Sequence, residues 1–524
     1  MRTTALLFAF VFTLLLLMAG CTPLRPVASE PDAPEPVTSD DDDDDATTGD
    51  DDDSTEPPGD DDDSTEAAWP DPFAERPDTS LGLTNTSADL VALLENGALQ
   101  TACADYEANP GDAQLRLLCG KAMFFYEGFD TIGMPTALYD FMANNFEPEL
   151  GLAFTELGLI PDPFSAEGRA LGVAPGAPLA GGSPTLAFNC ASCHFGQLPD
   201  GRYSVGAANH DYDYGGHMLS LMLLPLAAQP GFDPSAHHPD AMAIVQPAVD
   251  RIGSDFLLQL QMGLALLPLL SETDATPSLD ATYEGLYASW LPGTMDFVMP
   301  PLPLDDGVHT ISKIIDLWDI PTAAEETEAG MDTALLAWSG GAVDLMTFLD
   351  GFVAIGDGDR EYWTPERLGP LHDYILSLRA PANPSPPNPA DVVAGEEVFM
   401  TEGCVDCHQG PGGSGLRFFT FEEIGTDDAM RYFADPDLTG SPCCGFDEAG
   451  TTELTHGIKS PRLTGLWAKS RFLHNGALGD LRELLCLDPR PAVTEFAYGA
   501  QGHEFGCELD TEDREALVNY LLAH

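Results

Sequence analysis

The sequence predicts a mainly α fold with long loops, preceded by a disordered acidic N-terminal stalk. Three observations support this prediction. Two apolar stretches, 240–270 and 510–522, are long enough for one or two helices each, and the second has apolar residues at helical spacing. Strand-like alternation is scarce, and the 51 Gly and 44 Pro residues gather in loops between the apolar stretches. The segment 30–66 holds 19 acidic residues and no Lys or Arg, which indicates a solvated chain that cannot pack.

Length and charge narrow the class of protein. The 524 residues allow about two to four domains. The formal net charge is -65 at pH 7, from 21 Lys and Arg against 86 Asp and Glu. This charge excludes a general nucleic-acid binder, which needs a basic face, and disfavours docking on anionic lipid. Without the acids of the stalk the remaining charge is still -46, so the folded part is acidic as well.

The first 20 residues are typical of an export signal. Arg2 is followed by an apolar run of 14 residues, Ala5 to Met18, which is too short for a comfortable membrane span. The run ends in small residues and Cys21, which resembles the bacterial lipoprotein cleavage site, where the Cys becomes the lipidated N-terminus. An ordinary signal peptide with an unrelated Cys is the alternative. We expect a signal peptide over 1–21 and a mature chain in the bacterial cell envelope, lipid-anchored and facing the periplasm or the cell exterior.

Residues 22–68 are predicted to be a disordered Asp-rich linker. The unit Asp-Asp-Asp-Asp-Ser-Thr-Glu occurs twice, at 50–56 and 60–66. Like charges at this density repel each other, and no apolar residue is available to pack. A calcium-binding loop is the alternative, but the segment lacks the interleaved Gly and the terminal bidentate Glu of a defined site.

One motif carries the chemistry, and it occurs twice. The copies are Cys190-Ala191-Ser192-Cys193-His194 and Cys404-Val405-Asp406-Cys407-His408. C-x-x-C-H is the attachment signal for c-type haem, because two thiols on one turn form thioethers and the adjacent His binds the iron. A structural zinc site would need a second ligand pair, and a redox C-x-x-C does not explain the His in both copies. The sequence therefore predicts two covalently bound c-type haems, each held by the two Cys and the His of its motif.

The spacing of the motifs predicts two cytochrome c-like haem domains. The two motif histidines are 214 residues apart, and a cytochrome c unit needs about 80–120 residues. We expect an N-terminal helical region with the first haem over 69–385 and a C-terminal cytochrome c domain with the second over 386–524. The stretch 510–522 is the expected last helix, with Leu517, Tyr520 and Leu521 on one face.

The 11 cysteines divide by role. Cys21 belongs to the predicted anchor and four belong to the motifs, which leaves six, an even number in an exported protein. Cys103 and Cys119 flank a short predicted helical hairpin and are expected to pair. Cys443, Cys444, Cys486 and Cys507 allow three pairings, of which the vicinal one is least favoured. Free buried thiols are the alternative.

From about residue 120 to the end, the chain resembles di-haem c-type cytochromes of the cytochrome c peroxidase superfamily, and within it the rubber-oxygenase-like branch. Seven blocks carry the resemblance in order and spacing: Phe124-Phe125-Tyr126, Phe188 to His194, Ile375-Leu376-Ser377-Leu378-Arg379-Ala380-Pro381, Glu423-Ile424-Gly425-Thr426-Asp427, Leu463-Thr464-Gly465-Leu466-Trp467-Ala468, Phe472-Leu473-His474-Asn475-Gly476 and Gly502-His503-Glu504-Phe505-Gly506.

The resemblance implies a division of labour between the haems. The C-terminal haem has His on both sides and relays electrons, with His408 as proximal ligand and His503 at the matching distal position. The N-terminal haem, on His194, has an open distal face for hydrogen peroxide or oxygen. Rivals of His503 for the distal position are Met430, His456, His474 and His524, none of which has a matched ligand role.

Other side chains have candidate roles beside the haems. Trp318 and Trp338 lie at positions that resemble tryptophan-containing family blocks and are candidates for the gap between the haems, with ordinary core packing as the alternative. The cations Arg462, Lys469 and Arg471 are candidates for haem propionates or are helix-surface charges.

His210 and His217 follow the first motif and are candidate catalytic residues, because a distal His can give a proton to bound peroxide. A surface role is the alternative for each. Phe124, Phe125 and Tyr126 are candidates for an apolar pocket instead.

We therefore expect a haem oxidoreductase of peroxidase type that takes electrons from a donor cytochrome. The acidic surface indicates a basic redox partner or serves solubility alone. The alternatives are a dioxygenase that cleaves an unsaturated hydrocarbon and a membrane-anchored electron-transfer cytochrome that is not an enzyme. The family's usual Ser-Val-Pro after His-Asn-Gly is here Ala477-Leu478-Gly479, so the oxidant and the organic substrate stay open.

Overall fold

The computed structural model describes residues 73–131, 133–229, 231–272, 281–296, 311–322, 325, 344–356, 358–414, 418–427, 457–491 and 500–524. The chain divides into two units, 1–66 and 67–524, and every described residue belongs to the second. The predicted signal peptide with Cys21 and the stalk therefore lie outside the described residues. The same holds for Trp338, Met430, Cys443, Cys444 and His456.

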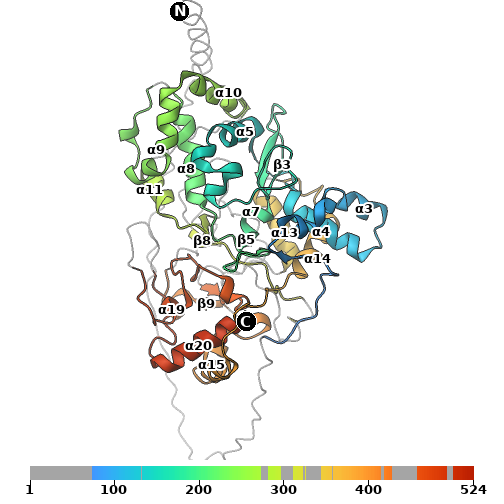
Figure 1. Ribbon diagram of the computed structural model, residues 1–524, viewed down its shortest axis with the longest axis vertical. Coiled ribbons are helices and arrows are strands. Elements are labelled where there is room, and N and C mark those ends of the chain that lie inside the picture. The colour runs from blue at the N-terminus through green and yellow to red at the C-terminus, as the bar shows by residue number, and fades with distance from the viewer. Residues whose placement is uncertain are drawn as a thin grey trace, which may run out of the picture. The chain divides into compact units, whose positions relative to one another are not determined.

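Helices dominate the described residues, so the mainly α prediction is confirmed (Figure 1). The α-helices are α2 (Leu90–Leu93), α3 (Ala102–Ala108), α4 (Ala113–Tyr126), α5 (Thr136–Asn145), α6 (Glu147–Leu150), α7 (Cys190–His194), α8 (Tyr214–Ala227), α9 (Pro239–Ser254), α10 (Phe256–Glu272), α11 (Ala281–Ser289), α13 (Leu345–Ile355), α14 (Pro365–Leu376), α15 (Pro389–Thr401), α16 (Cys404–Cys407), α17 (Phe421–Ile424), α19 (Leu481–Leu484) and α20 (Thr511–Ala523). Short 3₁₀ turns are η1 (Glu95–Gln100), η2 (Leu152–Leu157), η3 (Pro234–Ala236), η4 (Pro411–Gly413) and η8 (Leu466–Ala468).

The strands are short and pair only antiparallel among the described residues. They are β1 (Thr86–Ser87), β2 (Met134–Pro135), β3 (Val173–Gly176), β4 (Thr185–Phe188), β5 (Phe195–Gln197), β6 (Tyr203–Val205), β7 (Thr294–Asp296), β8 (Ile311–Lys313), β9 (Phe418–Thr420) and β10 (Gly457–Lys459). They form sheets in the orders β1-β6-β5, β2-β4-β3, β7-β8 and β10-β9. The first two sheets flank α7, because β4 leads into that helix and β5 leaves it.

The apolar stretch predicted over 240–270 forms two helices, α9 and α10, which pack with α8 in one hydrophobic core. Nearly all of α8 is buried, as expected for a helix that is apolar on every side. The break falls at Asp255, whose carboxylate accepts the N–H groups of Leu257 and Leu258 and so starts α10. Among the described residues no single helix meets the length and hydropathy of a membrane span; the sharply bent pair of α9 and α10 meets them jointly, by length and composition alone.

A second core surrounds α4 and α14, and a disulfide fastens its edge. Helix α4 packs against α3 and α14, and Gly120 of α4 permits the close contact, since a Cβ there would lie 2.0 Å from the carbonyl oxygen of Pro370. The hairpin of α3 and α4 is closed by the bond between Cys103 and Cys119, which confirms the predicted pair.

Replacing Cys103 and Cys119 by Ser is expected to lower the free energy of unfolding by about 3 kcal/mol, because the bond closes a short loop that the unfolded chain otherwise leaves open. Urea unfolding of the double variant and the wild type measures the difference. Either single replacement should have nearly the same effect, since one thiol cannot form the bond. A double variant within 0.5 kcal/mol of the wild type would contradict the expectation.

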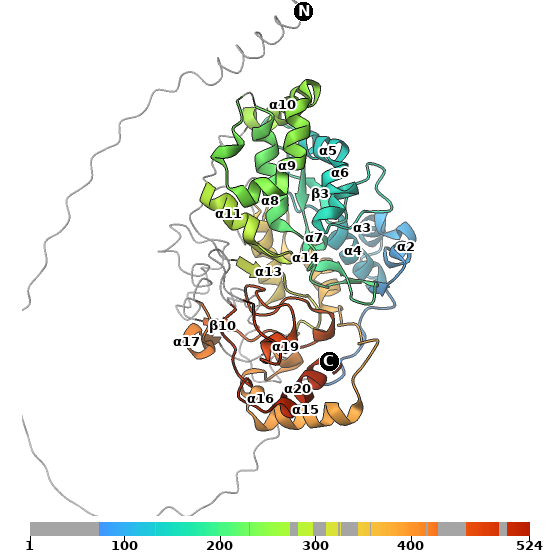
Figure 2. The same cartoon turned by 60° about the vertical axis from the view of Figure 1, so that its left-hand side comes forward.

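The C-terminal region is built on two crossed helices, α15 and α20 (Figure 2). Gly395 permits the crossing, because a Cβ there would lie 2.0 Å from the carbonyl oxygen of Ala516. Helix α20 begins at Asp510, whose carboxylate accepts the N–H groups of Glu512 and Asp513. The predicted apolar face is confirmed: its members are 2% (Leu517), 4% (Tyr520) and 6% (Leu521) exposed.

Candidate functional site

The C-terminal motif lies on a single helical turn that follows α15. Gly403, with φ 78°, makes the sharp turn from α15 into α16, and the spacing of three places the thiols of Cys404 and Cys407 on one side of that turn. The loop after His408 then folds back through glycines in the left-handed region. It brings the carbonyl oxygen of Gly413 to 2.9 Å from Nδ1 of His408. This contact fixes the ring and leaves Nε2 for a ligand.

Beside this turn the protein encloses a cavity of about 560 Å³. The volume falls within the range of about 300–1,000 Å³ that is usual for cofactor sites. Its lining is largely apolar and comes from most elements of the C-terminal region, including Phe399, Phe419, Ile458, Leu463, Leu466, Phe472, Leu481, Leu484, Leu485, Leu517 and Leu521. Cys404, Cys407, His408 and His503 line the same cavity. The motif thus borders a space that is large enough for a flat organic cofactor.

His503 faces His408 across this cavity. Their ring centroids are 6.2 Å apart and the ring planes meet at 60°. The backbone N–H of His503 donates to the carbonyl oxygen of Ile424 at 2.8 Å, which connects the loop that carries His503 to α17. Its Nδ1 is buried and has no hydrogen-bond partner among the described residues. Removal from water, with a smaller effect of His408, lowers the pKa of His503 to about 4, so the imidazole is neutral at pH 7, as a metal ligand must be.

The rival histidines occupy other positions. His474 also lines the cavity, but its Nε2 lies 3.3 Å from Oδ1 of Asp427 and its ring is almost fully buried. His524 stacks on Phe73 with centroids 3.9 Å apart and is not part of the lining. Among the described histidines, the geometry therefore favours His503 as the partner of His408. The other two rivals, Met430 and His456, lie outside the described residues.

Basic side chains line the same cavity in an unusual concentration. The chain has only four lysines, and three of them, Lys313, Lys459 and Lys469, border the cavity together with Arg462. Burial and the nearby charge of Lys469 lower the pKa of Lys313 to about 7. Four acids, Glu402, Asp406, Glu423 and Glu508, line the cavity as well, so the cations offer local partners for the carboxylates of a ligand rather than a net positive charge.

The lysine and arginine at this border are held by a buried acid. The Nζ of Lys469 lies 2.7 Å from Oδ2 of Asp316, and Arg462 donates to the backbone oxygen of the same Asp at 2.7 Å. Burial alone would raise the pKa of Asp316, but the charges of Lys469 and Arg462 hold it below its usual range. Arg471, the third cation of the predicted set, donates to the carbonyl oxygen of Pro292 at 2.8 Å and is not part of the cavity lining.

The N-terminal motif forms α7, a five-residue helix. The carboxamide of Asn189 accepts the N–H of Ala191 at its start. At its end, the N–H of Gly206 donates to the carbonyl oxygen of His194 and the N–H of Asn209 to that of Cys193, both at 2.8 Å. These contacts satisfy carbonyls that such a short helix leaves open.

The imidazole of His194 is held like that of His408. Its Nδ1 lies 2.8 Å from the carbonyl oxygen of Ile315, and removal from water lowers its pKa to about 4. Burial raises the pKa of Cys190 to about 12 and that of Cys193 to about 11, so both remain protonated thiols. Of the cysteines in the described ranges, the four thiols are those of the two motifs, and the others are paired.

The structure separates the two candidate catalytic histidines. Nδ1 of His210 accepts the backbone N–H of Ser470 at 3.1 Å, and burial together with Lys313, Arg471 and Lys469 lowers its pKa to about 3. His210 therefore lies beside Lys313, two residues before Ile315, whose carbonyl oxygen contacts His194. His217 is fully buried on α8.

His217 lies in an aromatic pocket next to the first motif. Its Nδ1 is 3.1 Å from the hydroxyl of Tyr212, and its ring contacts Phe154 and Phe188, the second residue before Cys190. Its Nε2 is buried without a hydrogen-bond partner among the described residues, and burial lowers the pKa of the ring to about 4. The distal role of either His210 or His217 stays a prediction.

One backbone segment, Lys313 to Asp319, contacts both motif regions. Lys313 borders the C-terminal cavity, the carbonyl of Ile315 holds His194, and Trp318 is buried between Gly206 and Gly465. The indole Nε1 of Trp318 donates to the carbonyl oxygen of Val205 at 2.9 Å. Trp318 thus lies between the supports of the two sites, a position compatible with either of its predicted roles, while Trp338 is outside the described residues.

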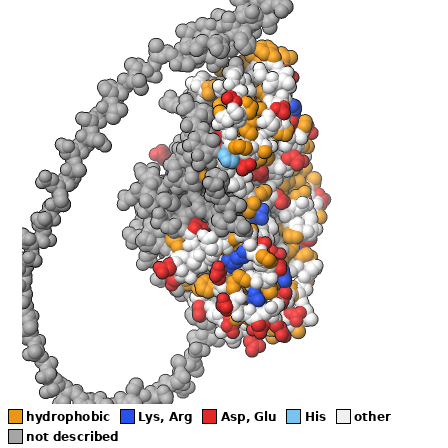
Figure 3. Space-filling view, turned by 90° about the vertical axis from the view of Figure 1, so that its left-hand side faces the viewer, with side chains coloured by type: hydrophobic (Ala, Val, Ile, Leu, Met, Phe, Trp, Pro, Cys, Tyr) orange, Lys and Arg blue, Asp and Glu red, His pale blue; other side chains and the backbone are white. Residues whose placement is uncertain are grey.

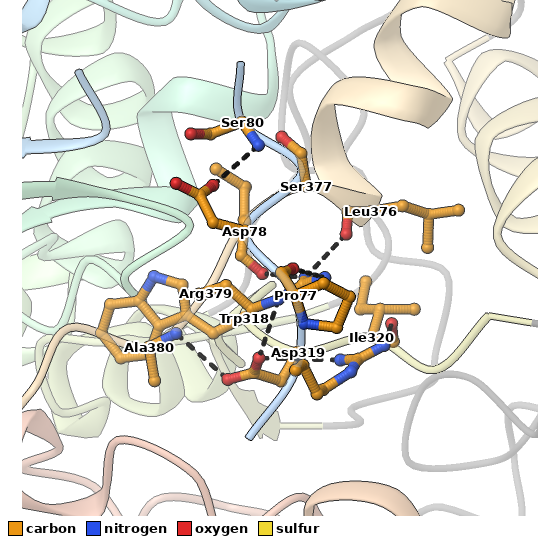
Figure 4. Close-up of polar contacts among 12 residues, drawn as sticks. Pro77, Asp78, Ser80, Trp318, Asp319, Ile320, Leu376, Ser377, Arg379 and Ala380 are labelled. Atoms are coloured by element: carbon orange, nitrogen blue, oxygen red, sulfur yellow. Dashed lines mark hydrogen bonds and ion pairs between the residues drawn. The ribbon is translucent and has the colours of Figure 1, made fainter. Parts of the chain in front are cut away.

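Asp319 fixes the end of this segment (Figure 4). Its Oδ2 accepts the backbone N–H of Ala380 at 3.1 Å, and its Oδ1 lies 3.6 Å from nitrogens of both Arg76 and Arg379. Arg379 also donates to the carbonyl oxygen of Leu376 at 2.8 Å. The segment is therefore anchored to the stretch that leads from α14 toward the C-terminal region.

Sequence reasoning missed several residues of the site. Lys313 and Lys459 were not singled out, although the scarcity of lysine in the chain is a signal that could have found them. Arg490, described below, gave no sequence signal. The pairing of Cys486 with Cys507 is one of the bonds that were left open, and it closes the loop that carries His503.

Comparison with known proteins gives little further information. No family model matches the chain, and no curated protein matches it. A search of solved structures finds a hydrazine synthase of Kuenenia stuttgartiensis pressurised with 20 bar xenon, with a TM-score of 0.26 and 17% identity over 48% of this chain and 84% of that one. A score this low does not establish a shared fold.

Proposed function

We propose that this chain is a di-haem c-type oxidoreductase of the cytochrome c peroxidase superfamily. His408 and His503 would hold the C-terminal haem, which would supply electron transfer, and His194 would hold the N-terminal haem, which would supply reactivity toward peroxide or oxygen. One observation carries the proposal: two neutral imidazoles face each other at 6.2 Å across an apolar cavity bordered by the thiols of a C-x-x-C-H motif.

The residues around the C-terminal cavity fit a covalent haem. Cys404 and Cys407 supply two thiols on one turn, and the cavity walls are largely apolar, as a porphyrin requires. Lys459 and Arg462 supply positive charge for the two propionates, and Lys313, with its pKa lowered to about 7, is partly charged at pH 7. The separation of the two imidazoles leaves room for one metal ion between them. His408 and His503 would hold a haem here, and the haem would supply a one-electron couple.

The chain's own residues tune and protect this couple. The carbonyl of Gly413 holds the Nδ1 proton of His408, which fixes the tautomer and strengthens the ring as a ligand. Each cation at the cavity border favours the reduced form of a couple held near it, because it stabilises the added electron, and each of the four acids in the lining opposes this effect. Apolar walls keep water out and strengthen these charge interactions.

For the N-terminal motif, the proposal rests on the same local arrangement. The carbonyl of Ile315 holds Nδ1 of His194, and the thiols of Cys190 and Cys193 are retained. His217 offers a buried, unused Nε2 next to this motif, and it and His210 are the candidates for moving a proton to a peroxide. Trp318, between the supports of the two motifs, is the candidate for carrying the electron across.

The charge of the protein supports a basic electron donor. Acidic side chains are spread over the described surface (Figure 3), and the sequence carries a formal net charge of -65. Such a surface attracts a positively charged cytochrome and speeds its association at low salt. We further propose that Cys21 anchors the chain by lipid in the bacterial cell envelope.

The test uses the full chain produced in a bacterium that attaches haem to exported proteins. We expect an intact mass with two haems, one added equivalent of carbon monoxide per reduced chain, and peroxide-dependent oxidation of a reduced basic cytochrome. A chain that gains no haem would overturn the proposal. Two haems that bind no carbon monoxide would indicate an electron carrier, and a stable oxygen complex without peroxide turnover would indicate a dioxygenase.

Replacing Lys459 by Met is expected to lower the reduction potential of the C-terminal haem. Loss of one charge at the cavity border removes about 1 kcal/mol of Coulomb stabilisation of the reduced form, which is about 40 mV for one electron. Potentiometric titration followed by absorbance measures the shift. The control is Arg367→Met, which removes an exposed cation that lies over the ring of Tyr362. Equal potentials in Lys459→Met and the wild type would contradict a propionate contact.

A further inference from the structure

The loop that presents His503 is held by one arginine. Arg490 directs all five of its N–H donors at backbone carbonyl oxygens. The acceptors are Glu483 at 3.1 Å, Leu484 at 2.8 Å, Ala500 at 3.0 Å, Gly502 at 2.8 Å and His503 at 3.0 Å. Two of these carbonyls belong to α19 and three to the segment that ends at His503, so the guanidinium joins the loop to the helix.

The backbone at His503 is one that needs such support. Gly502 has φ 98° and His503 has φ 50°, and a non-glycine residue in the left-handed region is strained. Strained residues persist only where the surroundings determine their conformation. Besides Arg490, those surroundings are the contact of the His503 N–H with Ile424 and the disulfide between Cys486 and Cys507.

We infer that Arg490 is a positioning residue for the imidazole of His503, and thereby decides whether the C-terminal haem keeps its distal ligand. The inference rests on the proposed function, in which His503 binds the haem iron. The disulfide closes the loop at its ends, whereas Arg490 fixes the carbonyl of the ligand residue itself and of its neighbour. Loss of the guanidinium removes five hydrogen bonds to backbone carbonyls, three of them in the segment that ends at His503, and with them a support of the strained conformation at His503.

A lysine cannot replace this arginine. The guanidinium is planar and presents five donors in a fixed fork, whereas an ammonium has three donors around one point. The two groups carry the same charge at neutral pH. Arg490→Lys therefore separates the hydrogen-bond geometry from the electrostatic effect of the cation on the cavity.

The control is Arg482 of α19. Its side chain pairs with the carboxylates of Asp488 and Glu515 and makes no described contact with residues 500–503. Arg482→Gln thus removes a nearby arginine without removing a hydrogen bond to the segment that ends at His503.

The experiment measures carbon monoxide stoichiometry and the low-spin ferric spectrum of the full haem-loaded chain. Arg490→Lys and Arg490→Gln should each bind one more equivalent of carbon monoxide than the wild type and lose at least half of the low-spin signal of the C-terminal haem. Added imidazole should restore that signal, because it supplies the missing ligand to an intact pocket. Arg482→Gln should match the wild type.

The outcomes separate this inference from the proposed function. If His503→Ala gains one equivalent of carbon monoxide but Arg490→Lys and Arg490→Gln behave as the wild type, the positioning role is refuted and the function stands. If His503→Ala also behaves as the wild type, the proposed ligand assignment fails. If imidazole restores no signal in either Arg490 variant, the arginine supports the pocket as a whole and the positioning role is refuted.

Discussion

Replacing His503 by alanine is expected to open the distal position of the C-terminal haem. The variant should bind one more equivalent of carbon monoxide than the wild type, and the low-spin ferric signal of this haem should disappear. The potential should rise on the order of 100 mV, within the range of about 0.8 V that axial ligands span. The reason is that, apart from His408, His503 is the described side chain best placed to reach a metal ion in the cavity. Absorbance, EPR and potentiometric titration measure the three effects.

The control for this prediction is His372→Ala. His372 lies on α14, where its Nδ1 is 3.0 Å from Oδ1 of Asp373, and it is not part of the cavity lining. It should leave the carbon monoxide stoichiometry and the spectrum of the wild type unchanged. Retention of the low-spin signal in His503→Ala would assign the distal position to another residue.

The second large effect is expected from Cys404→Ser with Cys407→Ser. This double variant should lose one haem from its intact mass and leave the apolar cavity of about 560 Å³ unfilled. The apolar walls then lose the group that they pack against, which lowers the stability of the region around them. The C-terminal region should therefore lose hydrogen-exchange protection in α15 and α20, which the mass-resolved exchange of peptides measures.

The matched variant, Cys190→Ser with Cys193→Ser, should lose the other haem and keep the exchange protection of α15 and α20. The expectation would be wrong if the Cys404 and Cys407 variant retained two haems. It would also be wrong if the variant lost one haem while α20 stayed as protected as in the wild type, because the cavity would then be stable without its occupant.

The sequence predicted those features of the fold and of the site that residues close together in the chain determine. The helices α9, α10 and α20 form in contiguous apolar stretches, and the bond between Cys103 and Cys119 joins neighbouring helices of one hairpin. The two C-x-x-C-H motifs are likewise contiguous, so their residues could be read without a fold.

What the sequence did not reveal depends on tertiary contacts. His194 and Ile315 are 121 residues apart, and Arg462 and Trp318 are 144 apart, so neither contact leaves a periodic trace. Arg490 acts through backbone carbonyls, which carry no side-chain identity that a sequence could display. The pairing of Cys486 with Cys507 depends on how the His503 loop returns to α19, and four candidate cysteines alone do not fix it.

The segment from Lys313 to Asp319 also limits how the gene for this protein can change. The segment belongs by sequence to the N-terminal region, yet Lys313 borders the C-terminal cavity while Ile315, two residues later, holds His194. Inserting or deleting one residue between them would shift the register of both supports at once. A cut at the predicted boundary before residue 386 would separate the cavity from one of its few lysines. Exchanging either region alone would therefore separate one of the two sites from a residue that supports it.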